Sequence, residues 1–294
     1  MIIEGTRISV DGFGGRASAY VLSHYHADHR SGLCEGWSRG DLYASGATCG
    51  LVEHMDGVAP GRLHPLDPGE TVTIDDPQAG AVTVTAIDAN HCPGALMLHF
   101  DVKGASVLYT GDFRIDDAMR ERVARLAPVG LLYVDGTYAE TAGRFPPQEE
   151  AIDEVVRLAE ANAHKDILLA VYTLGKNRVL EAVSRRLGKP VYLPARTLKV
   201  YRLLGYGEFV TGDRKATNIR GYMRGYFESY YKMQRSYHDG SAVVIIPTGW
   251  AVEGEDRYER DKRYHYVAYS EHCDATERAE FIDIVKPARI VDIT

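Results

Sequence analysis

A short peptide near the N-terminus concentrates side chains that bind metal ions. The sequence SHYHADH places His24, His26, Asp28 and His29 within a single short run. Imidazole nitrogens and carboxylate oxygens together suit zinc or a comparable transition metal. A purely structural role would require burying several titratable groups at a cost in free energy, so it is the weaker interpretation. The motif therefore predicts a metal site.

Two residues further along the chain complete the candidate set. His91 lies in DANHCPGA, where Pro93 and Gly94 predict a turn, and Asp112 lies in VLYTGDFR, just past a predicted strand. A carboxylate such as that of Asp112 can bridge two metal ions. The first metal is expected to bind His24, His26, His91 and Asp112, and the second Asp28, His29 and Asp112. The second would keep positions for water and substrate, as catalytic metals do.

The elements that must position these residues change in character along the chain. Short apolar or alternating runs predict strands at 19–23, 82–87, 95–102, 105–109 and 131–134. After residue 147 the pattern predicts a helix with Pro in its first turn, a strand at 167–172, a helix from about Gly175, a strand at 191–193 and a further helix. A strand at 242–246, a helix at 274–285 and a strand at 289–293 follow. This alternation is α/β, and the helix-rich middle predicts a domain inserted into a strand-rich catalytic domain.

Composition limits the class of protein. The chain has 294 residues, 45% hydrophobic and 26% charged, as in ordinary globular proteins. No apolar run approaches the ~20 residues of a membrane span, and the N-terminus does not resemble a secretory signal. The four cysteines form no framework spacing, so we interpret them as reduced thiols of an intracellular protein. Cys92 and Cys273 follow candidate site histidines, but adjacent side chains diverge, so neither is expected to be a ligand.

The formal net charge of −7 argues mildly against a nucleic-acid partner, because such proteins usually carry a basic surface. The stretch from Arg214 to Arg235 is a local exception. It interleaves aromatic residues with Arg214, Lys215, Arg220, Arg224, Lys232 and Arg235. Two interpretations stay open for it: a path for a nucleic-acid strand, or a solvated helical face with an aromatic stripe in the core.

Taken together, the motifs resemble a known group. HxHxDH, NHCPG, YTGDFR, VDGTY and YSEH resemble the DNA cross-link repair nucleases, relatives of Artemis and Apollo in the β-CASP branch of the metallo-β-lactamase superfamily. The resemblance extends over nearly the whole chain, from SVDGF to YSEHCDATE. It implies a metallo-β-lactamase αββα sandwich at 1–143 and 263–294, with a β-CASP α/β domain inserted at 144–262.

The resemblance also implies roles for individual residues. It assigns His24, His26, Asp28, His29, His91 and Asp112 to the metals, with Asp28 and Asp112 also catalytic. It makes Asp135 an acid near the metals and places His272 at the scissile phosphate. It draws a pocket for a terminal 5′-phosphate from Thr137, Tyr138, Lys176 and Ser270. A lysine beside a glycine at a helix start suits phosphate on its own chemistry as well. The implied cofactors are one tightly held zinc and a second, weaker divalent metal.

The expected function is a metal-dependent 5′→3′ exonuclease on single-stranded DNA or 5′-phosphate ends, in cross-link or end repair. It would act in the nucleus of a eukaryote or otherwise in the cytoplasm, away from membranes. The final KPARIVDIT has no histidine where RNA-processing relatives place a ligand, which favours DNA. A structure-selective endonuclease and a β-CASP ribonuclease remain alternatives. A small-molecule hydrolase would not need the middle domain, and a non-catalytic scaffold should have broken metal motifs, which are intact here.

Overall fold

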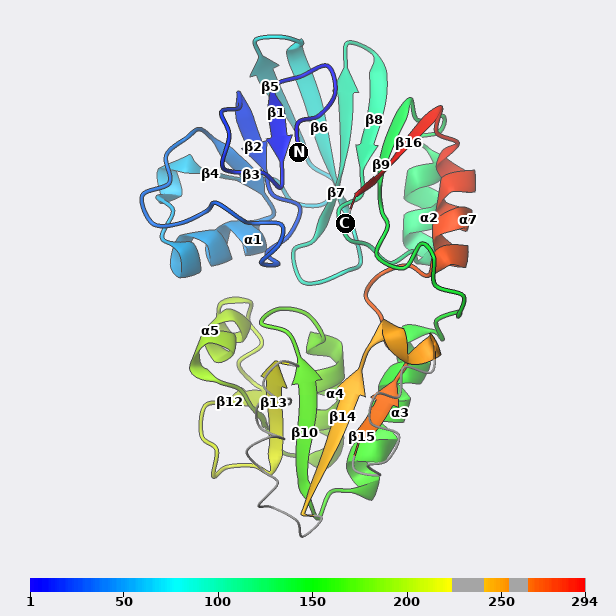
Figure 1. Cartoon of the computed structure of the whole chain (residues 1–294). Helices are drawn as coiled ribbons and strands as arrows, with labels where there is room; N and C mark the ends of the chain where they lie inside the picture. The colour runs from blue at the N-terminus through cyan, green and yellow to red at the C-terminus, as the bar shows by residue number, and fades with distance from the viewer. Residues whose placement is uncertain (224–240, 254–263, 294) are drawn as a thin grey trace. The chain divides into compact units, whose positions relative to one another are not determined.

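The computed structural model describes residues 1–223, 241–253 and 264–293. The chain forms two compact units (Figure 1). The first unit comprises Met1–Glu140 with Glu271–Thr294, and the second comprises Thr141–Ser270. Each unit has its own sheets and its own apolar core.

Two sheets form the centre of the first unit. The smaller is parallel, in the order β1 (Ile8–Val10), β2 (Ala19–Val21), β3 (Leu42–Ala44) and β4 (Leu63–Pro65). The larger runs in the order β16 (Arg289–Ile293), β9 (Leu131–Asp135), β8 (Ala105–Tyr109), β7 (Leu96–Val102), β6 (Gly80–Asp88) and β5 (Thr71–Asp76). In this sheet β5 to β8 are antiparallel, while β8, β9 and β16 are parallel.

The inner faces of these sheets share one core. Val10 and Val21 of the smaller sheet belong to the same buried cluster as Val84 and Phe100 of the larger. Helix α1 (Gly46–Leu51), continued by the π-helical η1 (Val52–Asp56), lies beside the smaller sheet, and η2 (Pro60–Arg62) precedes β4. Helices α2 (Asp117–Ala124) and α7 (Ala275–Val285) pack together beside the larger sheet (Figure 1). This confirms the αββα layering expected from the sequence.

The second unit is built on one parallel sheet. Its order is β12 (Val210–Thr211), β11 (Val191–Tyr192), β13 (Ile219–Met223), β10 (Asp166–Val171), β14 (Ala242–Pro247) and β15 (Tyr264–Val267). Among its described residues, the helices are α3 (Gln148–Ala161), α4 (Asn177–Leu187), α5 (Ala195–Leu203) and the short η4 (Gly249–Glu253). Apolar residues of α3, α4 and α5 share a buried cluster with one face of the sheet. The α/β character expected for the middle of the chain is confirmed.

The unit boundaries differ from those expected from the sequence. The expected division changed at 143 and again at 263, whereas the compact units change after Glu140 and after Ser270. The second difference has a clear cause. Strand β15 pairs in parallel with β14, so residues 264–267 extend the sheet of the second unit. The chain re-enters the first unit only at Glu271.

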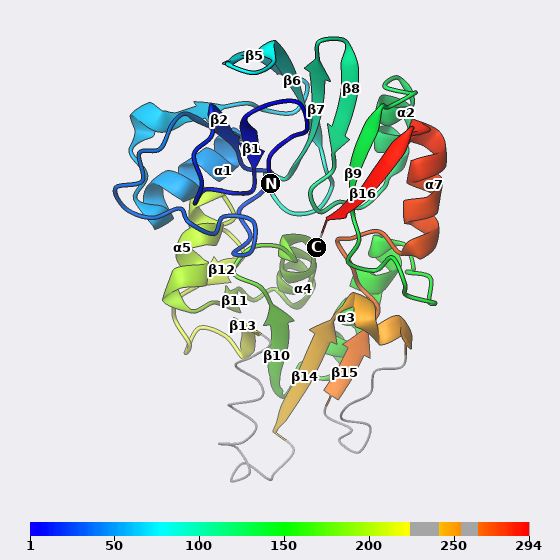
Figure 2. The same ribbon diagram turned by 45° about the horizontal axis from the view of Figure 1, so that its top comes forward.

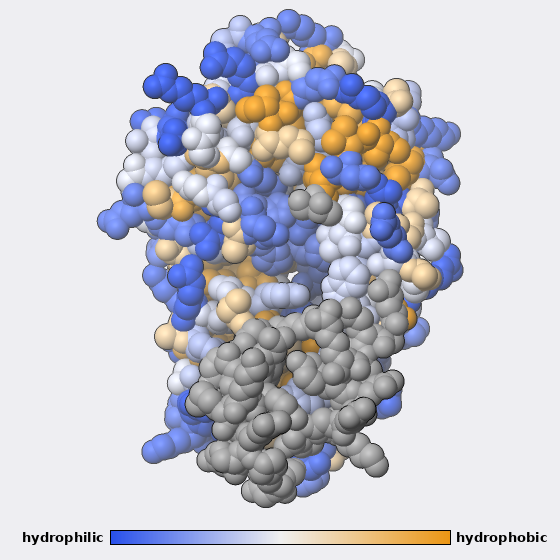
Figure 3. Space-filling view, in the orientation of Figure 1, coloured by the Kyte–Doolittle hydropathy of each residue, from blue (hydrophilic) through white to orange (hydrophobic). Residues whose placement is uncertain are grey.

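The surface of the described residues is mostly hydrophilic, with apolar patches interspersed on the face shown in Figure 3. The large exposed apolar side chains are Met1, Ile2, Tyr172, Leu203, Met223 and Ile290. Within the described ranges, no helix combines the length and hydrophobicity needed to cross a bilayer.

Candidate metal centre

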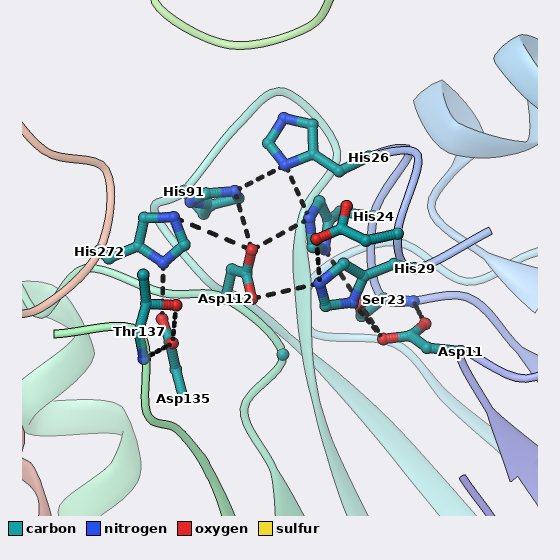
Figure 4. Close-up of polar contacts among 12 residues, drawn as sticks. Asp11, Ser23, His24, His26, His29, His91, Asp112, Asp135, Thr137 and His272 are labelled. Atoms are coloured by element: carbon teal, nitrogen blue, oxygen red, sulfur yellow. Dashed lines mark hydrogen bonds and ion pairs between the residues drawn. The ribbon is translucent and has the colours of Figure 1, made fainter. Parts of the chain in front are cut away.

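The polar residues of the candidate site lie together at the ends of strands in the first unit. His24 lies just past β2, Asp112 just past β8, and Asp135 is the last residue of β9 (Figure 4). Gly111, with φ of +53°, allows the loop after β8 to approach the loop after β2. A Cβ at Gly111 would lie 3.0 Å from the Cβ of Ser23, so a side chain there would push Asp112 away from His24.

Four of the expected ligands form an inner group. One ligand atom from each of His24, His26, His91 and Asp112 lies within 4.8 Å of every other. The Nδ1 of His26 lies 2.9 Å from the Nε2 of His24 and 3.1 Å from the Nε2 of His91. His24 is fully buried and the side chain of His91 is 2% exposed. The inner group thus presents three imidazole nitrogens and a carboxylate to one point.

Asp112 faces a second, outer group as well. Its Oδ2 lies 3.5 Å from His24 Nε2 and 3.6 Å from His91 Nε2, while its Oδ1 lies 3.3 Å from His29 Nε2. The same His29 nitrogen lies 3.8 Å from an oxygen of Asp28. The two oxygens of Asp112 therefore point to different histidines, which is the arrangement a bridging carboxylate requires. Asp28 is 79% exposed, so the outer group opens to solvent.

Hydrogen bonds fix which nitrogen of His24 and of His91 faces the centre. The backbone carbonyl of Glu271 can only accept, so the Nδ1 of His91, 2.8 Å away, carries the proton. The Ser23 hydroxyl donates its only hydrogen to Asp11 and therefore accepts from the Nδ1 of His24, at 3.0 Å. Both Nε2 lone pairs then point at the Asp112 carboxylate. A cation satisfies this cluster of acceptors, so the residues fit a bound metal ion.

Asp11 is a site residue that the motif search did not single out. Its carboxylate accepts from Ser23 N at 2.8 Å, Ser23 Oγ at 2.6 Å, His29 Nδ1 at 2.8 Å and Tyr109 Oη at 3.0 Å. It thus supports His29 directly and His24 through Ser23. The signal that the sequence offered was an acid beside a glycine in SVDGF. In the structure Asp11 follows β1 with a φ of +50°.

The charges of the cluster are coupled to its contacts. Burial disfavours protonation of His91 and, with the neighbouring histidines, holds its pKa well below the usual range. Burial acts in the same direction on His29, but hydrogen bonds to Asp11 and Asp112 outweigh it and raise the pKa to about 11. Despite burial, the neighbouring His24 and His29 keep the pKa of Asp112 well below its usual range. A proton and a metal ion are alternatives at His29 Nε2, so metal binding there should release a proton.

His272 and Asp135 form a pair at the edge of the inner group. The Nδ1 of His272 lies 2.8 Å from Asp135, and its Nε2 lies 3.9 Å from Asp112. Burial lowers the pKa of His272, but the hydrogen bond and charge of Asp135 outweigh it and raise the value to about 9. Thr137 donates to Asp135 from its backbone N at 2.9 Å and its hydroxyl at 2.6 Å. In this structure the Thr137 hydroxyl therefore orients Asp135.

The other residues expected in the phosphate pocket lie in both units. Tyr138, in the first unit, places its ring centroid 5.8 Å from that of His272. Lys176 and Ser270 belong to the second unit. Lys176 precedes α4 with a φ of +56°, is buried, and donates from its ammonium to the carbonyls of Ala170 and Pro247. The carbonyl of Ser270 accepts from Gln148.

The basic-aromatic stretch from Arg214 to Arg235 is described only in part. Arg220 lies in β13 and pairs with Asp166 at 3.0 Å, and the Arg214 guanidinium lies 5.6 Å from the Tyr192 ring centroid. Arg224, Lys232 and Arg235 lie outside the described residues. The expectation that Arg220 contacts a nucleic-acid strand is therefore weakened, because its charge is already paired.

Comparisons with known proteins agree with this geometry. The model of the β-lactamase superfamily domain matches residues 14–169, and the model of DNA repair metallo-β-lactamases matches residues 212–294. DNA cross-link repair protein SNM1 of Arabidopsis thaliana is 31% identical over 98% of this chain and 64% of its own length. The 5′ exonuclease Apollo of Gallus gallus is 32% identical over 99% of this chain and 63% of its own length. The chain thus spans less than two thirds of either relative.

A solved structure shows the same fold. A protein of unknown function from Enterococcus faecalis V583 aligns with a TM-score of 0.63 at 16% identity, over 94% of this chain and 75% of that one. The superfamily model alone covers more than half of the chain and includes the six residues that the sequence predicted as metal ligands. The chain therefore belongs to the metallo-β-lactamase superfamily, whose fold implies divalent metal binding, and its C-terminal part is similar to the DNA repair metallo-β-lactamase model.

Proposed function

We propose that this chain is a metal-dependent nuclease that hydrolyses phosphodiester bonds of DNA, from a 5′ end, in DNA repair. The observation that carries the proposal is the Asp112 carboxylate, whose two oxygens face the inner and the outer histidines. Bridged two-metal sites are typical of phosphodiester hydrolysis. The relatives named for cross-link repair and 5′ exonuclease activity support DNA as the substrate. Such a protein would act where DNA is, in the nucleus of a eukaryote or otherwise in the cytoplasm.

The inner group is the better zinc site, because three imidazoles and one carboxylate suit zinc. When bound, the two ions would supply an activated water and polarise the phosphoryl group. Asp112 would be a ligand of both ions, and Asp28 and His29 would complete the outer site. Its exposure leaves room there for substrate oxygens.

His272 would act on the phosphate directly, and Asp135 through it. Asp135 and Thr137 fix the ring of His272 so that Nε2 turns toward Asp112. In its cationic form, this nitrogen can donate a hydrogen bond to a phosphoryl oxygen or to the leaving oxygen. We therefore assign Asp135 as a positioning residue and His272 as the catalytic one.

The 5′ polarity depends on a pocket for the terminal phosphate, for which Thr137, Tyr138, Lys176 and Ser270 remain our candidates. A buried ammonium such as that of Lys176 can form charge-assisted hydrogen bonds, roughly twice as strong as neutral ones. The test uses otherwise identical 5′-phosphate and 5′-hydroxyl strands of DNA and of RNA, with metal analysis of the same preparation. We expect 5′-phosphorylated DNA to be degraded faster than 5′-hydroxyl DNA by about tenfold or more, in steps from the 5′ end.

Other outcomes would identify the alternatives. Internal cuts at equal rates on both DNA strands would indicate an endonuclease, and faster cleavage of RNA would indicate a ribonuclease. Lys176→Ala should erase most of the 5′-phosphate preference while the metals and residual cleavage remain. The control is Lys103→Ala, which replaces an exposed lysine in the β7–β8 turn. A preference that survives Lys176→Ala would show that the pocket lies elsewhere.

A further inference from the structure

The second unit contains a segment whose charge opposes that of the whole chain. No acidic residue occurs between Glu181 and Glu208, although the formal net charge of the chain is −7. The basic residues in this interval are Arg185, Arg186, Lys189, Arg196, Lys199 and Arg202. Arg185 and Arg186 pair with Glu181 and Glu160. The others include all the cations of helix α5.

Helix α5 exposes three cations along its length. Arg196, Lys199 and Arg202 are spaced three residues apart and all are exposed. From the first to the last, they span about 9 Å of helix axis. Among the described residues, neither Arg196 nor Arg202 forms an ion pair with an acid. The helix lies at the end of the sheet beside β12 and β11 (Figure 2).

A surface hollow accompanies this row. Its volume is about 400 Å³, and it is lined by Ala195, Leu198, Lys199, Arg202 and Leu203. The leucine side chains give it an apolar lining, with the two cations at its side. Leu203 is one of the few large apolar residues left exposed, at 39%. Cations beside an apolar hollow match the alternation of phosphate and base along a nucleic-acid strand.

Stabilisation of the helix itself does not explain why Arg196, Lys199 and Arg202 all lie on α5. A cation near a helix C-terminus offsets the helix dipole, which explains Arg202 in the last turn. Arg196 lies in the first turn, where the dipole disfavours a positive charge, and that turn holds no acid. A cation kept at this position indicates a role outside the helix.

We propose that the exposed face of α5 binds a single strand of DNA, with phosphates at Arg196, Lys199 and Arg202 and a base against Leu203. The inference rests on the proposed function, because that strand is the substrate. In this proposal, the face of α5 takes the place of the stretch from Arg214 to Arg235 as the basic surface, among the described residues, that would bind DNA. The face binds any sequence, because it contacts phosphates and the apolar surface of a base rather than the base edges.

The test compares two triple variants of equal charge change. The first is Arg196→Gln, Lys199→Gln and Arg202→Gln. The matched control is Arg157→Gln, Arg185→Gln and Arg186→Gln, whose exposed side chains each pair with a nearby glutamate. Binding of a cleavage-resistant phosphorothioate DNA strand to the metal-loaded protein is measured across a salt series. We expect at least a tenfold higher Kd at low salt for the α5 variant and less than twofold for the control.

The salt dependence distinguishes direct contact from a general charge effect. Each phosphate contact contributes about 0.7 to the log–log slope for a single strand, so the α5 variant should lose about 2. Leu203→Ala should weaken binding of a normal strand about threefold and leave an abasic strand unaffected. Equal Kd values and slopes in the two triple variants would overturn the proposal, as would an effect limited to RNA.

Hydrolysis of bis(4-nitrophenyl) phosphate separates this proposal from the proposed function. This small diester has a single phosphate and no strand that could extend to the cations of α5. The wild type and both triple variants should therefore hydrolyse it equally. A wild type that hydrolyses neither the diester nor DNA would refute the nuclease, while the binding series would still decide the role of α5. Normal hydrolysis with unchanged strand affinity would refute the α5 face alone.

Discussion

The inner and outer parts of the metal centre share one carboxylate but differ in how firmly their residues are held. Around the inner part, His24 and His91 are buried, and each has its second nitrogen fixed by Ser23 or by the carbonyl of Glu271. In the outer part His29 is fixed by Asp11, whereas Asp28 projects into solvent. The difference teaches that preorganisation is uneven: buried hydrogen bonds hold the inner histidines, whereas the outer group includes a solvent-exposed carboxylate.

Two acids, Asp112 and Asp11, connect the inner and outer parts of the metal centre. Asp112 contacts both His24 and His29 at the centre of the site. On the other side of these histidines, Asp11 contacts His29 directly and His24 through Ser23. Changes at these acids should therefore affect both metals. A change at Asp28 should affect the outer metal only, and a change at Ser23 should affect mainly the inner one.

The largest effect is expected for Asp112→Ala. Loss of the shared carboxylate removes a ligand from each site, so DNA cleavage should fall by about 10³-fold or more and metal content should drop at both sites. Cooperative unfolding should persist, because the variant removes a charge rather than core volume. The measurements are cleavage rate, metal stoichiometry and a urea melt. Asp117→Ala, at a fully exposed carboxylate of α2, is the control. Unaltered turnover with full metal content would refute the bridged two-metal site.

Asp11→Asn tests the connection that Asp11 makes between His29 and, through Ser23, His24. Replacement of a carboxylate that supports a metal-ligating histidine costs about 10–100-fold in metal affinity. The loss should be greater at the outer site, because His29 contacts Asp11 directly and His24 only through Ser23. Zinc titration of the metal-free protein, resolved into two affinities, measures it. Ser23→Ala should weaken the inner affinity more than the outer, because it removes the acceptor at His24 Nδ1 and only one of the four donors to Asp11. Equal losses at both sites in both variants would show that the halves are not separately supported.

Asp28→Ala should have a smaller effect that excess metal reverses. An exposed carboxylate acts through a dielectric close to that of water, so the outer affinity should fall by about tenfold. At limiting metal, activity should drop by the same factor, and added divalent metal should restore it. Inner-site affinity should stay unchanged. If saturating metal fails to restore turnover, Asp28 contributes to the chemical step itself and not only to metal binding.

The sequence predicted most of the fold because its elements carry strong local patterns. The apolar runs before His24 and Asp112 form β2 and β8, and the helix after Pro147 is α3. Short elements with weaker patterns were not predicted, among them β1 and β3, which hold only three residues each. The later unit boundary differs from the expected one because no strand was predicted at 264–267, and only the pairing of β15 with β14 assigns these residues to the second unit.

The clustering of the candidate ligands could be predicted from the sequence, but their supporting residues could not. Every residue assigned to the metals lies in the cluster that the structure brings together, because side chains of that type at that spacing have few structural uses. The supports have no such signature. Ser23 and Asp11 are common residue types, and the carbonyl of Glu271 is a backbone atom that any residue provides. Only the geometry of three separate loops reveals them.

The smallest effect concerns the fourth donor to Asp11, the hydroxyl of Tyr109. Burial and the charge of Asp11 raise the pKa of this tyrosine, so the hydroxyl keeps its proton and donates to the carboxylate. Tyr109→Phe leaves the ring in place and removes that bond, which should lower the free energy of unfolding by about 1.5–3 kcal/mol. Metal affinity should fall by no more than about fivefold, because Ser23 and His29 still hold Asp11.

Tyr133→Phe is the matched control for this change. Tyr133 is equally buried, pairs with Tyr109 in the adjacent strand, and places its ring centroid 6.0 Å away. Its hydroxyl accepts only a long bond of 3.4 Å from the backbone of Glu4, far along the chain from the metal motifs. Urea unfolding and zinc titration of both variants measure the difference. If Tyr133→Phe weakens the outer metal as much as Tyr109→Phe does, the tyrosines act through packing of the sheet. If Tyr109→Phe alone lowers the metal affinity more at the outer site than at the inner site, then the loss of one hydrogen bond to Asp11 affects His29. His29 belongs to the outer group, which is the less firmly held half of the centre.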